Sequence, residues 1–295
     1  MTQGNAHAAL LGVVDGASPE SARLVCMLYG TCAPARDLQP FVRCYWWVTD
    51  EGGPGAPADT VVPDGCAELI INAGDAMEQL DGADHREQPR AMIVAEVRRP
   101  VQVRPTGRVE LFGVRLTPVG IRSLLRVPAH EIVDRTLDLA DVADHGLRAG
   151  LCRLPELAAH DRPGYANEVL RASMGSHREL DALVWRLTAA MEALEGRCTV
   201  TELSAKAGIS ARHLERRFRT QVGVPPQALL AVLRFRRVLA SLDAQMPAWA
   251  HVAAACGYHD QSHLIRDFKR YTGMSPRAFL GDKNPFGELF LPAGR

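Results

Sequence analysis

The chain has 295 residues, which suggests about two domains of ordinary size. Hydrophobic residues make up 47% and charged residues 23%, a composition that argues against wholesale disorder. Lysine and arginine together number 34, as do aspartate and glutamate, and this neutrality argues neither for nor against a nucleic-acid partner.

The seven cysteines have irregular spacings and no CxxC pair, which argues against a zinc ribbon or a disulfide scaffold. The N-terminus lacks the basic start and apolar run of a signal peptide. No stretch approaches the ~18 uninterrupted apolar residues of a membrane span. We therefore expect a cytoplasmic protein that makes no contact with a membrane.

Residues 1–22 are small and polar and are expected to form a flexible tail. From Leu38 to Pro118 the pattern is typical of short strands, with Gly, Pro and Asp clusters between them at 51–57, 63–65 and 81–89. The expected strands are residues 41–48, 60–62, 68–72, 92–97, 101–104 and 109–116. Six short strands with turn chemistry between them favour an antiparallel barrel or sandwich.

The pattern then becomes helical. We expect short helices at 120–127 and after Pro128, with further helices within 138–160 and 165–173. Met174-Gly175-Ser176 is a plausible boundary, so a β-rich regulatory domain with trailing helices would occupy 23–175. Apolar residues from Leu180 to Leu194 then recur at helical spacing, and Gly196 would end that amphipathic helix.

A repeat with an offset of 50 residues follows. Residues 210–230 (SARHLERRFRTQVGVPPQALL) align without gaps to residues 260–280 (DQSHLIRDFKRYTGMSPRAFL), and eight of the 21 positions are identical. Leu214 and Phe218 correspond to Leu264 and Phe268, one helical turn apart and expected to face the core. A period of this length indicates one supersecondary unit used twice.

Each copy predicts two helices joined by a tight turn. In the first, Thr199 caps a helix at 200–207, Gly208 makes the turn, and Ser210 caps a helix at 211–222. In the second, the helices are expected at 248–256 and after Asp260, with the turn at Gly257. This is the helix-turn-helix pattern, whose second helix enters the major groove of DNA.

A linking helix at 226–243 would join the two units, and residues 285–295 would form a second tail. The predicted fold class is α+β, with an N-terminal antiparallel barrel or sandwich and a C-terminal all-α domain at 176–284. Residues 195–283 carry 14 basic against 7 acidic residues, whereas the rest carries 20 against 27. This asymmetry favours a polyanionic partner for the C-terminal part.

The two motifs LSAKAGISARHLERRF and VAAACGYHDQSHLIRDFKRYTGMSPRAF, with the linking helix and the ending Gly273-Met274-Ser275-Pro276-Arg277, resemble the AraC/XylS family of bacterial transcription regulators. The resemblance covers about residues 178–283. It implies a sequence-specific transcription factor that binds double-stranded promoter DNA and works with RNA polymerase. A small-molecule effector and a homodimer are further partners to be considered, and we expect no cofactor and no catalytic residue.

The second helix of each unit is expected to supply the DNA contacts. The candidates are Arg212, Glu215, Arg216, Arg219, Gln261, Ser262, Ile265, Arg266 and Lys269. The acidic Glu215 is a departure that would reduce nonspecific affinity or read a cytosine amino group, and Asp267 follows Arg266. The sequence does not separate base contacts from phosphate contacts, and a plain helical hairpin with a solvated arginine face is the competing interpretation.

The N-terminal part resembles the sensor domain of a subset of the same family, through Tyr45-Trp46-Trp47 and the segments 62–70 (VPDGCAELI) and 125–131 (LRVPAHE). The candidate ligand-binding residues are Tyr45, Trp47, Asp64, Cys66 and Glu68. Strand aromatics more often fill a core, and Pro63-Asp64-Gly65 is also a plain turn sequence.

Two further functions stay open for the N-terminal domain. Cys44 and Cys66 could sense oxidants, and barrel sensors share folds with metal-dependent enzymes. The strand region contains one histidine, His85, which excludes a three-histidine metal centre there but not a carboxylate-rich one. We expect no metal and no enzymatic activity. A DNA-binding module coupled to an enzymatic or thiol-reactive domain is the alternative.

Overall fold

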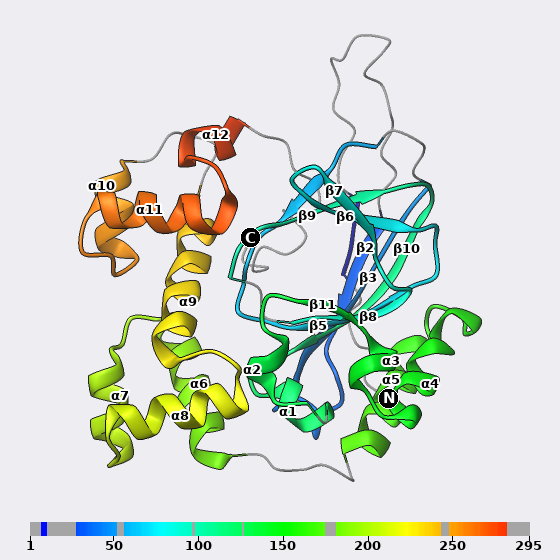
Figure 1. Ribbon diagram of the computed structural model, residues 1–295, viewed down its shortest axis with the longest axis horizontal. Helices are drawn as coiled ribbons and strands as arrows, with labels where there is room; N and C mark the ends of the chain where they lie inside the picture. Colours follow the sequence, from blue (N-terminus) through cyan, green and yellow to red (C-terminus); the bar gives the residue numbers. More distant parts are fainter. Residues whose placement is uncertain are drawn as a thin grey trace.

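The computed structural model describes residues 7–10, 28–51, 56–95, 98–125, 127–174, 181–242 and 248–281. The chain forms a β-rich N-terminal region and a helical C-terminal region that lie side by side (Figure 1). The predicted α+β class is confirmed, with two open antiparallel sheets in place of a closed barrel. None of the helices in these ranges combines the length and the apolar character needed to cross a bilayer.

Seven strands form the larger sheet. In spatial order they are β1 (His7–Leu10), β2 (Leu28–Cys32), β3 (Val42–Asp50), β10 (Val109–Leu116), β5 (Glu68–Asn72), β8 (Ala91–Val94) and β11 (Thr136–Asp138). Neighbours are antiparallel, with Gly113 of β10 opposite Trp46 of β3 and Ile70 of β5. All five residues of β5 are buried, because this central strand is covered on both faces.

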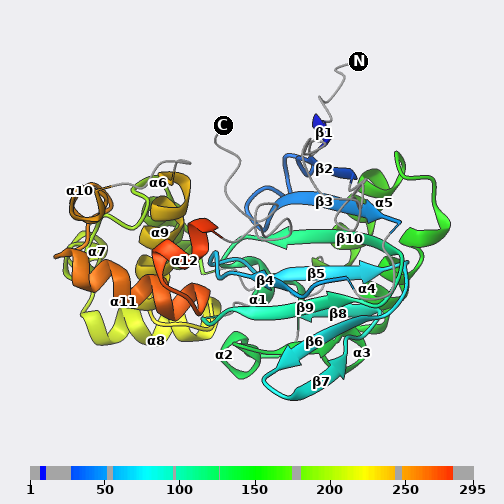
Figure 2. The same cartoon turned by 90° about the horizontal axis from the view of Figure 1, so that it is seen from above.

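Four strands form the smaller sheet, which lies against the larger one (Figure 2). Their order is β4 (Asp59–Val61), β9 (Val101–Pro105), β6 (Met77–Asp81) and β7 (Asp84–Glu87). The facing sides of the two sheets share a core that includes Trp46, Ile70, Met92 and Leu111.

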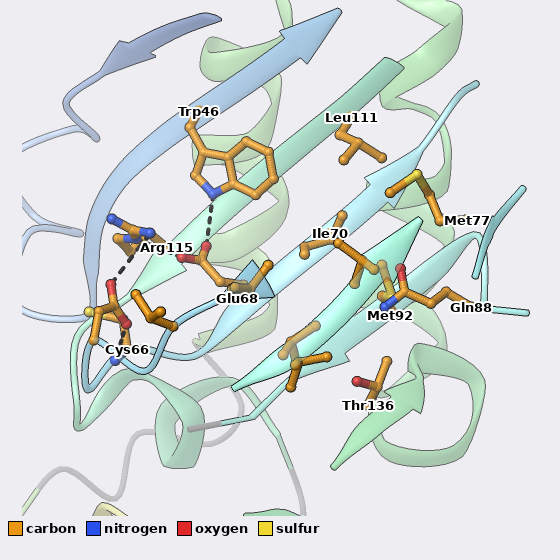
Figure 3. A pocket seen from close by; sticks show the side chains of 16 residues that line it. Trp46, Cys66, Glu68, Ile70, Met77, Gln88, Met92, Leu111, Arg115 and Thr136 are labelled. Atoms are coloured by element: carbon orange, nitrogen blue, oxygen red, sulfur yellow. Dashed lines mark hydrogen bonds and ion pairs between the residues drawn. The ribbon is translucent and has the colours of Figure 1, made fainter. Parts of the chain in front are cut away.

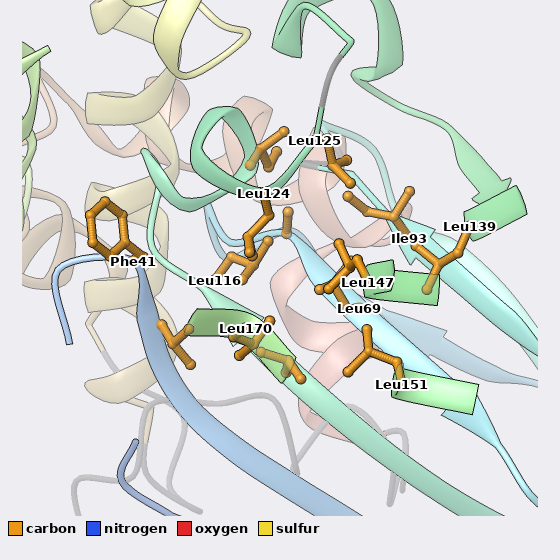
Figure 4. Close-up of a cluster of buried hydrophobic side chains, with 14 of the residues drawn as sticks. Phe41, Leu69, Ile93, Leu116, Leu124, Leu125, Leu139, Leu147, Leu151 and Leu170 are labelled. Atoms are coloured by element: carbon orange, nitrogen blue, oxygen red, sulfur yellow. The ribbon is translucent and has the colours of Figure 1, made fainter. Parts of the chain in front are cut away.

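The other face of the larger sheet is covered by helices. These are α1 (Gly120–Leu124), α2 (Ala129–Ile132), α3 (Leu139–Val142), α4 (His145–Cys152), the 3₁₀ helix η1 (Leu154–Glu156) and α5 (Arg162–Met174). Leu69 and Ile93 of the sheet pack there with Leu147 and Leu170 of the helices (Figure 4). The expected arrangement, a sandwich with trailing helices, is therefore present.

All six expected strands are found, and 68–72 and 109–116 have the predicted bounds. The assignment of 81–89 entirely to a turn is wrong, because β6 and β7 form a hairpin around Gly82, at φ +62°. Strand β7 is exposed at all four residues, so no apolar alternation marked it. Residues 7–10 pair with β2, which corrects the expectation of a tail without structure over all of 1–22. Strands β2 and β11 were also missed.

In the C-terminal region, all the secondary structure of residues 181–242 and 248–281 is helical. The helices are α6 (Ala182–Ala193), α7 (Val200–Ala207), α8 (Ala211–Gln221), α9 (Pro226–Ala240), α10 (Trp249–Ala255), α11 (Gln261–Thr272) and α12 (Pro276–Gly281). The predicted linking helix is α9, and it ends at Ala240. The expected boundary at 175–176 and the tail at 285–295 lie outside the described residues.

Helix α9 carries two cores. Leu229, Leu230 and Leu233 pack with α6, α7 and α8 around Phe218. Val232, Phe235, Val238 and Leu239 pack with α10 and α11 around Phe268. Each helix pair of the repeat therefore has its own core, and α9 joins them.

We expect Phe218→Ala and Phe268→Ala each to lower the free energy of unfolding by about 3–5 kcal/mol, because each leaves a cavity in a closed core. Both side chains are 0% exposed. Urea unfolding monitored by circular dichroism checks this, with Thr220→Ala on the exposed side of α8 as the control. A loss below about 1 kcal/mol at both positions would contradict the two-core description.

Candidate nucleic-acid interface and cavity

Helices α8 and α11 begin in the same way. The Ser210 hydroxyl accepts a hydrogen bond from the His213 amide at 3.2 Å, and the Asp260 carboxylate accepts one from the His263 amide at 2.7 Å. These caps satisfy amides that a helix N-terminus leaves free. Gly208, at φ +65°, and Gly257, at φ +79°, make the preceding turns in the left-handed region. The predicted helix-turn-helix geometry is thus present twice.

Figures 1 and 2 show α8 and α11 at opposite ends of α9 and on the same side of it. Their buried residues are equivalent in the repeat, since Leu214 and Leu264 are 0% and 1% exposed. The opposite face of each helix is open. One molecule can therefore present two recognition helices in the same direction.

The structure places nearly all the candidate DNA contacts on that open face. Arg212, Arg216, Arg219, Gln261, Ser262, Arg266 and Lys269 are exposed, whereas Glu215 and Ile265 are half-buried. Ile265 packs at the edge of the α10–α11 core, so its side chain also has a structural role.

Four basic side chains on this face make no hydrogen bond or ion pair within the described part of the chain. They are Arg212, Arg216, Arg266 and Lys269. Arg219 instead forms an exposed ion pair with Glu215 one turn earlier, at 3.0 Å. An exposed pair of this kind is worth little energy, so the guanidinium can exchange Glu215 for a phosphate at small cost.

Other basic residues of the region have structural partners. Arg217 donates two hydrogen bonds of 2.6 Å to Asp181, the residue that caps α6. Burial alone would raise the pKa of Asp181, yet the bonds from Arg217 and from backbone amides lower it. Arg234 lies over the Tyr258 ring, and Arg237 pairs with Glu195 at 3.3 Å. These three arginines therefore stabilise the fold through contacts with other segments of the chain.

Asp267 does not weaken the open face. Its side chain is 14% exposed, and one carboxylate oxygen lies 3.7 Å from His263 Nε2. Burial raises its pKa, with His263, Arg270 and Arg234 acting in the opposite direction. The acidic neighbour of Arg266 thus faces the interior.

A cavity lies between the two sheets of the N-terminal region (Figure 3). It encloses about 760 Å³, including the part open to solvent. Its walls are mostly apolar, with polar side chains at Asp64, Glu68, Gln88, Arg115 and Thr136. A mostly apolar lining with a few polar groups fits the general pattern of small-molecule sites in proteins.

An ionic cluster closes one end of this cavity. Glu68 accepts hydrogen bonds from Arg115 Nε at 2.6 Å and from Trp46 Nε1 at 2.8 Å. Asp64 lies 3.4 Å from another nitrogen of Arg115. Burial raises the pKa of Glu68, partly offset by Arg115. The cluster therefore holds two carboxylates around one guanidinium in a poorly hydrated place.

Asp64, Cys66 and Glu68 line the cavity as candidates, but Tyr45 and Trp47 do not. Side chains alternate along β3, so Tyr45 and Trp47 pack on the helix-covered face, where the Tyr45 hydroxyl donates to Asn167 at 2.9 Å. Trp46 faces the cavity in their place. Its indole lies over Gly113, where an added Cβ would come within 1.9 Å of the ring.

Residues 62–66, Val62-Pro63-Asp64-Gly65-Cys66, join the cavity to helix α9, and we name them the contact loop. Asp64 accepts a hydrogen bond from the Cys66 amide at 2.9 Å, and Gly65 has φ +79°, so the predicted turn is present. The same Asp64 pairs with Arg115 in the cavity. Val62 packs in the core around Phe268, and a Cβ on Gly65 would lie 3.2 Å from Leu229 Cδ1.

A second contact joins the N-terminal region to the first helix pair. Val119 belongs to the core around Phe218, and Val133 packs against that core. Gly223, after α8, approaches so closely that a Cβ would lie 2.9 Å from the Ala129 carbonyl oxygen. Both helix pairs therefore touch the β-rich region.

The thiols near the cavity are in environments that suppress the thiolate. Burial raises the pKa of the Cys66 thiol to about 12 and that of Cys44 to about 11. The thiolate is the reactive form, so neither site favours thiol chemistry at neutral pH. Within the described ranges, no group of three or more His, Cys, Asp or Glu side chains is placed to hold a metal ion.

Comparison with known proteins assigns both regions. Residues 203–282 match a family of helix-turn-helix domains, and residues 30–138 match a domain of unknown function, DUF6597. The raffinose operon transcriptional regulatory protein RafR of Pediococcus pentosaceus is 32% identical over 79 residues. That match covers 27% of this chain and 28% of RafR, so it spans little more than a quarter of that relative.

Two solved structures are also similar. ToxT from Vibrio cholerae, at 10% identity and a TM-score of 0.45, covers 77% of this chain and 95% of its own. The DNA-binding domain of AdpA, in complex with a target DNA, is 30% identical with a TM-score of 0.31 and covers 35% of this chain and 92% of its own. The family match and the doubled helix pair confirm the resemblance seen in the sequence: this chain carries an AraC-type helix-turn-helix domain at 203–282, preceded by a DUF6597 domain at 30–138.

Proposed function

We propose that the protein is a sequence-specific transcriptional regulator in which α8 and α11 enter successive major grooves of promoter DNA. The single observation that carries this proposal is the paired open face, where exposed basic side chains without partners occupy both recognition helices. Two such helices on one rigid linker fit the way helix-turn-helix units read duplex DNA. We assign the regulatory domain to residues 23–175 and the DNA-binding domain to 176–284.

The N-terminal domain receives the signal in this proposal. A ligand alters transcription only if it favours one state of the protein over another. The contact loop supplies a physical route, since Asp64 belongs to the ionic cluster of the cavity while Val62 and Gly65 rest against α9 and its cores. A shift of Asp64 on ligand binding would move the contact loop, which packs against α9.

The remaining partners follow from this role. A promoter-bound regulator changes transcription through contact with RNA polymerase or by excluding it, and two copies could occupy adjacent sites as a homodimer. Such a regulator acts in the cytoplasm, at the nucleoid. The alternative, a thiol-reactive or enzymatic N-terminal domain, has no observation in its favour, because the thiols at the cavity have raised pKa values.

The first prediction concerns salt. Affinity of the full chain for a duplex selected from a random-sequence library should fall linearly on a log–log plot, with a slope of about −0.9 for each phosphate neutralised. The four basic side chains without partners alone would give a slope of about −3.6. Fluorescence anisotropy across a salt series measures it. A folded protein whose binding does not change with salt would contradict the proposed interface.

Arg216 and Arg266 occupy equivalent positions in the two recognition helices. Replacing either with Ala should weaken binding to the selected duplex by about 1–3 kcal/mol if it reads a base, and should relax preference at one position. A phosphate contact would instead weaken all sequences alike and lower the salt slope by about one. Arg86→Ala, on exposed strand β7, is the control. Wild-type binding by both variants would show that these helices are not in the groove.

The contact loop can be tested without touching the DNA interface. Gly65→Ala puts a side chain at φ +79° against Leu229, so the loop should move away from α9 and change DNA affinity severalfold. Gly82→Ala is the matched control, at φ +62° with no atom within 4 Å of its Cβ. Both should lose a similar amount of stability by thermal unfolding. Equal DNA affinity in both variants would exclude the loop as the route of coupling.

A further inference from the structure

The cavity between the sheets has an excess of acidic groups at its closed end. Among the side chains that line it, Asp64 and Glu68 are the carboxylates and Arg115 is the only cation. Arg115 already donates to Glu68 through Nε and lies 3.4 Å from Asp64, so its charge is shared between two anions. Arg43, behind the contact loop and outside the lining, is held by Glu192 of α6 and also acts on Asp64.

This arrangement selects against an anionic ligand. A carboxylate entering the cavity would meet two like charges in a poorly hydrated place and would have to displace one of them from Arg115. A cation would meet the opposite situation. In the lining, two carboxylates share the one guanidinium of Arg115, so an ammonium group would find a carboxylate partner there.

Gln88 is a polar group of the cavity wall outside the ionic cluster. The residue is 7% exposed, and Figure 3 shows its side chain among those that line the cavity. Its side-chain amide makes no hydrogen bond to any residue in the described part of the chain. A ligand that forms a hydrogen bond to this amide would give it the partner that it lacks within the described part of the chain.

Between the ionic cluster and Gln88, the wall of the cavity is apolar. Ile70, Met77, Met92, Val103 and Leu111 form its walls, together with the ring of Trp46. Such walls favour a hydrocarbon or aromatic body, at about 25 cal/mol for each Å² of apolar surface removed from water.

We propose that this cavity binds a hydrophobic amine, with its ammonium group against Asp64 and Glu68, its apolar body between the sheets and a hydrogen-bonding group reaching Gln88. The inference rests on the proposed function, because it names the class of effector that the regulatory domain recognises. The ammonium offsets the excess negative charge beside Arg115. It also acts on Asp64, the residue that ties the cavity to the contact loop and so to α9.

Three compounds share the same phenylbutyl group and differ only in the charge of their head group: phenylbutylamine, phenylbutanol and phenylbutanoate. Comparing their affinities separates the effect of charge from that of the apolar group. Isothermal titration calorimetry of the full chain at neutral pH should show the amine binding at least about tenfold more tightly than the alcohol, equivalent to about 1.4 kcal/mol, with the carboxylate weakest. A carboxylate that binds as tightly as the amine would overturn the proposal, as would the absence of binding by all three.

Two variants test whether Asp64 and Glu68 cause the preference for the amine over the alcohol. Glu68→Gln and Asp64→Asn keep the size of each side chain and remove one charge, and each should reduce the preference for the amine over the alcohol by about tenfold. Asp84→Asn on exposed β7 makes the same chemical change outside the cavity and should leave the preference unaltered. An unchanged preference in both cavity variants, with their thermal unfolding intact, would place the amine elsewhere.

These measurements involve no DNA. Loss of amine selectivity would therefore leave the DNA-binding proposal standing, and a failure to bind DNA would not affect the calorimetric result. If the amine binds as expected, its addition to the anisotropy assay then tells whether occupancy of the cavity changes DNA affinity.

Discussion

The structure depends on helix α9 burying side chains in two separate cores. Its N-terminal half packs around Phe218 and its C-terminal half around Phe268. A helix is a stiff spacer, so burial along its whole length sets both the distance and the relative orientation of the two recognition helices. Sequence-specific binding to successive grooves needs that spacing, which makes the apolar contacts of α9 as important to function as the arginines that face outward.

The same helix is where the regulatory region makes contact. The contact loop rests on α9 at Gly65 and enters the core around Phe268 through Val62, while Val119 and Val133 reach the core around Phe218. The β-rich region thus touches both helix pairs and their linker. Since packed cores have discrete arrangements, a small displacement at the loop can favour one placement of the recognition helices over another.

The helical half of the fold could be predicted closely, because its determinants are local. Thr199, Ser210 and Asp260 cap helices as expected, and Gly208 and Gly257 adopt the left-handed conformation that the turns require. Spacing within one helix also predicted the inward residues. The hairpin β6–β7 escaped prediction because cross-strand backbone hydrogen bonds hold it at a sheet edge, with no apolar pattern to reveal it.

The cavity was less predictable. Asp64, Cys66 and Glu68 were found from their segment, but the choice of Tyr45 and Trp47 depended on which way β3 faces. The neighbouring strands β10 and β2 determine the orientation of β3, because their glycines leave room for its indole rings. Gly113 lies under Trp46, and Gly30 lies under Trp47. Gln88 and Arg115 carried no local signal, since they come to the cavity wall only after the sheets have paired.

The sequence by itself determined the repeat, the caps, the turns and the outward positions of the recognition arginines, because each depends on residues within one or two helical turns of one another. Only the tertiary structure decided which arginines pair within the described part of the chain, since Arg216 makes no ion pair there while its neighbour Arg217 is bound to Asp181, 36 residues away. It also decided the charge balance of the cavity, because strand register places Arg115 of β10 opposite Glu68, 47 residues earlier in the chain.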